Sequence, residues 1–210
     1  MELTELPELT EQRRIGLTGG IASGKSSVGR LLAARGLPLL DADVYAREAL
    51  APGSTGAGAV LGRYGAGVRA PGGEIDRAAL GRIVFGDGAE RRWLEQLLHP
   101  VVRACFKAQL QELAAEPVVV LVVPLLFEAG LETLCSEVWL VDCDPEQQRE
   151  RLIGRDQFSA AEAEARLAAQ WPLERKRPLA DQLIDNRGMP EQLEAQVDRA
   201  LAFNKTTIEP

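Results

Sequence analysis

One eight-residue stretch constrains this chain more than any other. Residues 19–26 read Gly-Gly-Ile-Ala-Ser-Gly-Lys-Ser, which fits the spacing G-x-x-x-x-G-K-[ST] of a phosphate-binding loop. The short segment Arg13 to Thr18 precedes the loop and reads as a buried strand that ends there. Apolar residues at helical spacing then predict a helix over Ser26 to Arg35, with Gly36 as its C-terminal glycine. The loop is therefore expected between a strand and a helix, as its chemistry requires.

The residue types in this loop explain how it would hold phosphates. Glycines let backbone N–H groups converge on an anion, and the helix start adds the positive end of a dipole. Lys25 supplies a mobile charge for the β- and γ-phosphates, and Ser26 Oγ is placed to ligate Mg²⁺. A glycine-rich turn that binds nothing is the alternative, but all four fixed positions of the motif are present. We expect the nucleotide to contact Gly20, Ile21, Ala22, Ser23, Gly24, Lys25, Ser26 and Ser27.

The composition excludes several classes of protein. The 210 residues, 46% of them hydrophobic, suffice for one domain with a real core. A net charge of −7 argues against a general nucleic-acid binder, which would carry a basic patch. The three cysteines form no C-x-x-C pair, so we expect a reducing cytoplasm. The acidic segment 1–12 lacks the apolar core of a signal peptide and is interpreted as a flexible extension, and no apolar run reaches membrane-spanning length.

Two aspartates follow the second predicted strand. That strand, Leu37 to Leu40, runs directly into Asp41 and Asp43. Carboxylates at the carboxyl end of a strand lie in the crevice where open α/β sheets bind ligands. One of them can instead cap the helix predicted over Val44 to Leu50. We expect one aspartate to be structural and the other to face the phosphates, and we assign Asp43 as the catalytic one.

The segment 53–116 has a helical pattern and is much longer than a simple crossover between strands. It predicts an inserted helical subdomain that binds the phosphate acceptor. His99-Pro100 predicts a break between two helices, because the residue before proline avoids the helical region. His99 is the only histidine. Both a packing or capping role and a functional role remain open for it.

The run Val118 to Val123 is apolar without alternation, as in a central parallel strand buried on both faces. A usual phosphate-binding-loop enzyme has an acidic residue at the end of such a strand to help hold Mg²⁺. Here those positions are Val122 and Val123. The metal would therefore depend on Ser26, the phosphates, water and Asp43. Glu137 to Asp142 reads as the next strand.

The segment 146–179 carries the chain's clearest concentration of cations, including Arg151, Arg155 and the run Glu174 to Arg177. Exposed arginines usually form a solvated face. In an acidic protein, after the fourth strand, their concentration favours a helical lid that closes over phosphates. Gln182 to Asp185 predicts a last strand, and Pro190 to Asn204 a closing helix. The predicted core is then 13–52, 117–145 and 180–210, with the insertion and the lid between its parts.

Five sequence blocks in this order resemble the dephospho-coenzyme A kinase family. They are residues 15–26, 41–43, 98–100, 124–128 and the pair 180–181 with 184–186. The resemblance extends from Arg13 to Leu201 and leaves out the acidic extension. It implies an α/β P-loop NTPase fold, in which helices flank a parallel sheet, with a helical acceptor-binding insertion and a helical lid.

The resemblance also implies the reaction and the roles of residues. ATP with Mg²⁺ would phosphorylate the ribose 3′-hydroxyl of dephospho-coenzyme A, the last step of coenzyme A synthesis. Asp43 would be the base, Arg155 would reach the ATP phosphates from the lid, and Asn186 would lie near the adenine. The acceptor site would be lined by His99, Leu125, Leu126, Phe127 and Glu128. The implied partners are small molecules, with neither nucleic acid nor a membrane.

Three other functions were weighed against this one. Another small-molecule P-loop kinase, acting on a nucleoside monophosphate or a sugar, would differ in its preferred acceptor. A switch GTPase would need an aspartate for guanine recognition, which Asn204 to Thr207 lacks. A nucleotide sensor without catalysis would not need Asp43 beside an intact loop.

Overall fold

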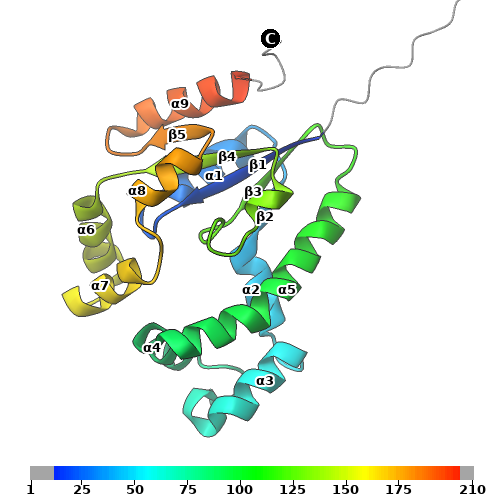
Figure 1. The fold of residues 1–210 in the computed structure, drawn as a ribbon, viewed down its shortest axis with the longest axis vertical. Coiled ribbons are helices and arrows are strands. Elements are labelled where there is room, and N and C mark those ends of the chain that lie inside the picture. Colours follow the sequence, from blue (N-terminus) through cyan, green and yellow to red (C-terminus); the bar gives the residue numbers. More distant parts are fainter. Residues whose placement is uncertain (1–11, 204–210) are drawn as a thin grey trace, which may run out of the picture.

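The computed structural model describes residues 12–203 and is built on a parallel sheet of five strands in the order β2-β3-β1-β4-β5 (Figure 1). The segments 1–11 and 204–210, which include most of the predicted extension and Asn204, lie outside the described residues. The strands are β1 (Arg13–Gly19), β2 (Leu39–Asp41), β3 (Val118–Val122), β4 (Glu137–Asp142) and β5 (Gln182–Asp185). This arrangement confirms the predicted α/β class.

Strand β3 lies in the interior of the sheet and is buried on both faces, as its sequence predicts. It pairs with β1 on one side and with β2 on the other, both in parallel. Val119, Val120 and Leu121 are each fully buried. Successive side chains of a strand point to opposite faces of the sheet, so this continuous apolar run packs against a core on each face. No polar alternation is needed where neither face meets water.

Helices α1 (Lys25–Ala34) and α9 (Pro190–Ala202) cover one face of the sheet. Val28 and Leu32 of α1 and Val197 of α9 pack there against Ile15 and Leu17 of β1. The other face is covered by the second half of α5 (Gly88–Glu112) and by the segment after β3, which contains the short helix η2 (Glu132–Leu134). The two cores hold the carboxyl ends of β1, β2 and β3 together, and the first two of these strands lead directly into the site described below.

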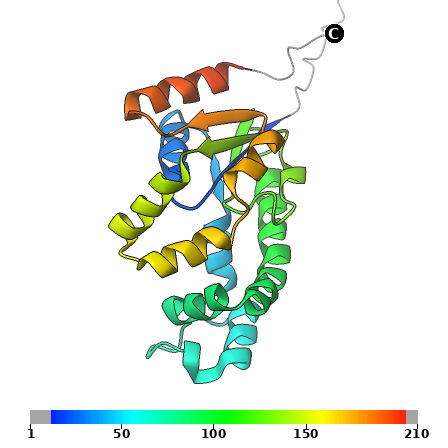
Figure 2. The ribbon, with the colours of Figure 1, turned by 60° about the vertical axis from the view of Figure 1, so that its left-hand side comes forward.

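The helices between β2 and β3 reach to the end of the molecule opposite α9, and α5 extends from that end back to the sheet (Figures 1 and 2). They are α2 (Ala42–Ala49), α3 (Thr55–Tyr64), η1 (Gly65–Val68), α4 (Arg77–Gly86) and α5. Val60, Val68 and Leu80 belong to a core cluster of their own, against which the first half of α5 packs. Helix α5 therefore belongs to two cores, one in this group and one under the sheet.

The predicted helix break at His99-Pro100 is wrong, because α5 continues through Pro100. Proline removes one intrahelical hydrogen bond and costs about 3 kcal/mol in a helix interior. Pro100 is exposed, so water can reach the carbonyl that loses its partner. Burying a side chain such as Val102 or Phe106 contributes roughly 1.5–3 kcal/mol each. Packing on both sides of Pro100 thus outweighs the local preference.

The predicted lid segment contains α6 (Pro145–Asp156), α7 (Ala160–Ala168), α8 (Leu173–Lys176) and the short helix η3 (Arg177–Leu179). Helix α7 begins with a capping box, in which Ser159 and Glu162 each accept a hydrogen bond from the other's backbone N–H. Helix α7 lies beside α4, where the Arg166 guanidinium is 4.8 Å from the ring centre of Phe85. Within residues 12–203, none of the helices has the length and apolar character needed to cross a membrane.

Candidate active site

The loop 19–26 has the conformation that its glycines predict. Gly24 has φ +98° and immediately precedes α1. A Cβ atom on Gly24 would lie 1.9 Å from Nδ2 of Asn186, so only glycine fits here. The first turn of α1 presents Lys25, Ser26 and Ser27 to a cavity. The strand–loop–helix arrangement required for phosphate binding is therefore present.

Side chains from distant segments hold this loop from outside. Arg151 of α6 donates from Nη1 to the Ala22 carbonyl at 3.1 Å. Gln148, also of α6, donates from Nε2 to the Ile21 carbonyl at 2.6 Å. Asn186, after β5, donates from Nδ2 to the Ser23 carbonyl at 2.7 Å. These donors fix the carbonyl oxygens of the loop, which preorganises its backbone for an anion.

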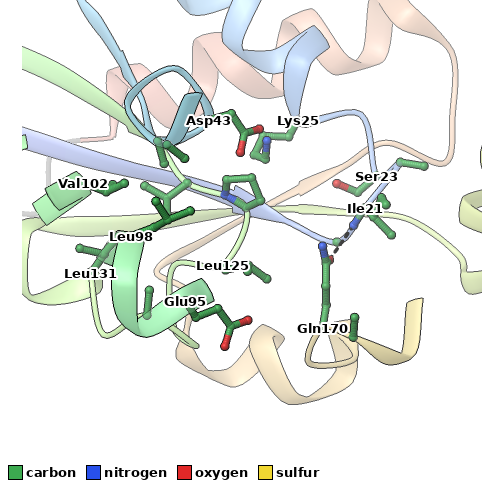
Figure 3. A pocket seen from close by; sticks show the side chains of 18 of the residues that line it. Ile21, Ser23, Lys25, Asp43, Glu95, Leu98, Val102, Leu125, Leu131 and Gln170 are labelled. Atoms are coloured by element: carbon green, nitrogen blue, oxygen red, sulfur yellow. Dashed lines mark hydrogen bonds between the residues drawn. The ribbon is translucent and has the colours of Figure 1, made fainter. Parts of the chain in front are cut away.

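The two aspartates after β2 have different surroundings. Asp41 is the N-cap of α2, and its carboxylate accepts a hydrogen bond from the Asp43 backbone N–H at 2.8 Å. Because α2 starts at Ala42, Asp43 lies in the first helical turn and not on an extended chain. Its side chain lines the cavity and lies beside that of Lys25 (Figure 3). The expected capping role of one aspartate is observed at Asp41, and the place of Asp43 at the phosphates stays a prediction.

Lys25 and Asp43 also influence each other's protonation. Burial in the cavity wall raises the pKa of Asp43, and the Asp41 carboxylate raises it further, whereas Lys25 and Arg47 lower it. Burial lowers the pKa of Lys25, against the opposing attraction of Asp43 and Asp41. Perturbed titratable pairs in a cleft are typical of catalytic sites. A carboxyl with a raised pKa is also a better proton acceptor than an ordinary aspartate.

The cavity beside these residues has a volume of about 790 Å³ and two different ends. One end is the phosphate-binding loop with Asp43. The other is largely apolar and lies between α4, α5 and the segment 123–131, where Leu98, Val102 and Leu131 face it (Figure 3). Arg91, Glu95 and His99 of α5 add polar groups to this wall. The cavity is large enough for a nucleotide-sized or larger molecule.

The structure separates the residues implied as an acceptor site. His99 and Leu125 line the cavity. Leu126 is fully buried in the core under the sheet, and Phe127 packs against the same core. Glu128 forms an ion pair with Lys176, whose side chain is fully buried. Leu126, Phe127 and Glu128 are not among the cavity-lining residues, and their role in acceptor binding stays a prediction.

Of the two predicted ATP-binding residues outside the loop, the structure describes the side chain of Asn186 only. Asn186 contacts the loop through Ser23, as described. Arg155 belongs to the last turn of α6, but its side chain lies outside the part of the chain that the structure describes. Its predicted contact with phosphate therefore remains untested.

Sequence reasoning missed two glutamines in this site. Gln148 is buried and bonded to the loop, and Gln170 accepts a hydrogen bond from the Ile21 N–H at 2.9 Å (Figure 3). Gln170 follows α7, on the stretch leading to α8. Neither belongs to a motif, and a glutamine in a polar helical segment ordinarily faces solvent. Only the folding of α6–α8 against the loop reveals them.

The residues present fit a magnesium ion bound chiefly through a nucleotide. Among the described residues no group of three or more histidine, cysteine, aspartate or glutamate side chains gathers as a metal site. Mg²⁺ characteristically uses one or two protein oxygens together with phosphates and water. Ser26 and Asp43 both line the cavity. This donor set suits Mg²⁺ only when phosphates are also bound.

A parallel sheet with this loop after its first strand, beside a carboxylate and a deep cavity, defines a P-loop kinase for a small molecule. A sequence profile described as dephospho-CoA kinase matches residues 13–192. A dephospho-CoA kinase of Synechococcus sp. (strain CC9605) is 63% identical over 196 residues, which cover 93% of this chain and 95% of that protein. The chain therefore belongs to the dephospho-CoA kinase family.

Solved structures agree with this assignment. The crystal structure of TT1252 from Thermus thermophilus superposes with a TM-score of 0.76 and 37% identity, over 91% of this chain and 97% of that one. A dephospho-CoA kinase from Campylobacter jejuni gives a TM-score of 0.66 and 28% identity, over 90% and 95% of the two chains. The similarity thus includes nearly the whole fold described above.

Proposed function

We propose that this chain transfers the γ-phosphoryl group of ATP to the ribose 3′-hydroxyl of dephospho-CoA, giving CoA and ADP. The observation that carries the proposal is the position of Lys25 and Asp43. They lie side by side where the phosphate-binding loop meets a cavity large enough for a second substrate. Family membership supports the identity of that substrate.

In this proposal each residue has one chemical task. Asp43 accepts the proton of the 3′-hydroxyl while that oxygen forms a bond to the γ-phosphorus. The bond between the γ-phosphorus and the β–γ bridging oxygen breaks, and ADP leaves. Lys25, the loop amides and Arg155 stabilise the charge on the transferring group, since phosphoryl transfer needs mainly positioning and charge stabilisation.

Ser26 is the proposed protein ligand of Mg²⁺, supported by Asp43, which lines the same cavity. When bound with ATP, the ion would neutralise charge on the β- and γ-phosphates. The valines at the end of β3 are buried and offer the ion no oxygen from a side chain. The protein's share of the coordination would therefore be small.

The insertion and the lid have separate proposed tasks. The acceptor would lie against α4, α5 and the segment 123–131, with His99 and Leu125 in contact with it. The segment α6–α8 would close over the phosphates, bringing Arg155 to them. Asn186, after β5, would lie near the adenine while it also holds the loop at Ser23.

The direct test is turnover of the purified chain with ATP, Mg²⁺ and a set of acceptors. We expect ADP release with dephospho-CoA, CoA as the product by mass spectrometry, and far lower rates with nucleoside monophosphates or sugars. Replacing ATP with GTP tests the nucleotide preference. Rapid phosphorylation of another acceptor, with dephospho-CoA left unchanged, would contradict the proposal.

A further inference from the structure

The chain returns from the lid to the sheet through a segment that is held by an ion pair with a buried lysine. Lys176 of α8 has no exposed surface, and its Nζ lies 2.8 Å from Oε1 of Glu128. The same Nζ donates to the Pro124 carbonyl at 3.4 Å. Pro124 and Glu128 belong to the segment after β3, part of which lines the cavity. This pair therefore attaches the base of the lid to the segment that follows β3.

Glu128 holds the lid at a second point. Its Oε1 also accepts a hydrogen bond from the Trp171 backbone N–H at 2.9 Å. The residue before Trp171 is Gln170, which accepts the Ile21 N–H of the phosphate-binding loop at 2.9 Å. The Glu128 carboxylate thus fixes both ends of the segment 171–176. Gln170, which immediately precedes this segment, contacts the loop that binds phosphate.

Stability alone explains this pair poorly. Removing a charge from water is costly, and a hydrophobic pair of similar volume is often as stable as a buried ion pair. Lys176 is fully buried, and Glu128 Oε2 has no hydrogen-bond partner among the described residues. Buried polar atoms are normally satisfied, so this oxygen is a cost that the ion pair has to offset. The ion pair does have one definite geometric effect, which is to fix the position of Gln170.

The pair also bears on the charge of the site. The Lys176 ammonium is one of the groups that lower the pKa of Lys25, although burial of Lys25 is the main cause. Glu128 neutralises that ammonium at close range. Without Glu128, an uncompensated positive charge would remain near Lys25, in a region where water screens poorly.

We propose that Glu128 and Lys176 are positioning residues for phosphoryl transfer, which fix the base of the lid so that Gln170 holds the Ile21 amide of the phosphate-binding loop. Neither residue needs to touch a substrate. The inference rests on the kinase activity proposed above. It assigns Glu128 to the lid, and not to the acceptor.

The test compares Glu128→Gln, Lys176→Met and the double variant with the wild type. Turnover number, KM for both substrates, the ATP dissociation constant and melting temperature are measured for each. Gln at 128 can still accept the Trp171 N–H, so this variant removes only the ion pair. We expect turnover to fall about 10–100-fold in all three, the scale of a misplacement by about 1 Å, with the ATP dissociation constant changed less than threefold.

A matched control comes from a carboxylate that is also ion-paired but lies elsewhere in the fold. Glu137 is 3% exposed and pairs with Arg13, at the beginnings of β4 and β1 and so at the far end of the sheet from the loop. Glu137→Gln should lower the melting temperature but keep turnover within about twofold. If Glu128→Gln fails to fold, the double variant, which leaves no unpaired charge, is compared with the wild type and with Glu137→Gln instead.

A double-mutant cycle with Gln170→Ala tests the route of the effect. If the pair acts through Gln170, adding Gln170→Ala to Glu128→Gln should lower turnover by much less than the product of the two single effects. Wild-type turnover in the double Glu128→Gln, Lys176→Met variant would overturn the inference. A weakened ATP affinity with unchanged turnover in Lys176→Met would overturn it too, by making Lys176 a phosphate ligand. An inactive wild type would instead refute the proposed function.

Discussion

The phosphate end and the acceptor end of the cavity are built in different ways. At the phosphate end, residues 20–27 are consecutive, and their backbone forms the surface that receives the anion. At the acceptor end, Phe85, Leu98 and Leu125 come from three separate segments, each held by its own core packing. The first end is a local motif with external support. The second is a surface that exists only when several elements pack together.

This contrast indicates where substitutions should be most damaging. At the phosphate end single side chains bring charge to the reacting atoms, and nothing else replaces them. At the acceptor end contacts are spread over many apolar side chains, so one loss changes binding slightly. Four predictions test this difference, from the largest expected effect to the smallest.

Asp43→Asn should have the largest effect. Asn keeps the shape of Asp43, and the capping carboxylate of Asp41 is unaffected. The asparagine side chain at position 43 cannot accept the proton of the 3′-hydroxyl, so turnover should fall roughly 10²–10⁴-fold. Both substrates should still bind. Asp41→Asn is the control and should be milder, because Asn caps helices about as well as Asp. The test measures melting temperature, dissociation constants and turnover of the two variants. An inactive Asp41→Asn variant beside an active Asp43→Asn variant would show that Asp41, and not Asp43, is the base.

Lys25→Ala should lower turnover by roughly 10²–10³-fold, the usual cost of losing one preorganised charge-stabilising group. The fold should persist, because Lys25 lies in the cavity wall and belongs to none of the core clusters. Circular dichroism and steady-state turnover test both parts. Activity within a few-fold of the wild type would remove the loop lysine from the mechanism.

The pH dependence should show a raised acid limb. Asp43 must be unprotonated to act as base, and its pKa is raised by burial and by Asp41. The value of kcat/KM should therefore fall about tenfold per pH unit on the acid side, beginning above the usual pKa of an aspartate. The free energy of unfolding should change in the opposite direction to the rate. The folded state binds the Asp43 proton more tightly than the unfolded state does, so the stability that this proton contributes is lost as pH rises through the folded-state pKa of Asp43. Rate–pH profiles and unfolding at several pH values test the two signs.

Arg166→Ala should have the smallest effect, because Arg166 affects the acceptor end only by holding the lid against α4. The Arg166 guanidinium lies 3.6 Å from the ring centre of Phe158 and 4.8 Å from that of Phe85, so it joins the lid to α4. An exposed cation–π contact contributes about 0.5–1 kcal/mol. We expect the KM for the acceptor to rise about 2–5-fold with turnover little changed. Asp198→Asn, on the exposed side of α9, serves as the surface control, and a large loss of turnover in Arg166→Ala would place Arg166 at the phosphates.

The sequence by itself determined the elements whose structure follows from local chemistry. The glycines at positions 19, 20 and 24 before Lys25 identified the loop, in which Gly24 has a positive φ. The unbroken apolar run of β3 identified a strand buried on both faces. The Asp41–Asp43 pair indicated one capping carboxylate, and Asp41 is the N-cap of α2. In each case a local pattern of residue types carries the information.

Only the tertiary structure decided the remaining features. Helix α5 continues through Pro100 because two cores, far apart in the sequence, pack on its two halves. Lys176 stands in a run of charged residues that reads as part of a solvated or phosphate-facing surface, yet it is fully buried because Glu128, 48 positions earlier, meets it. Gln148 and Gln170 reach the phosphate-binding loop only when α6–α8 fold against it. Such contacts join distant segments, and no local spacing encodes them.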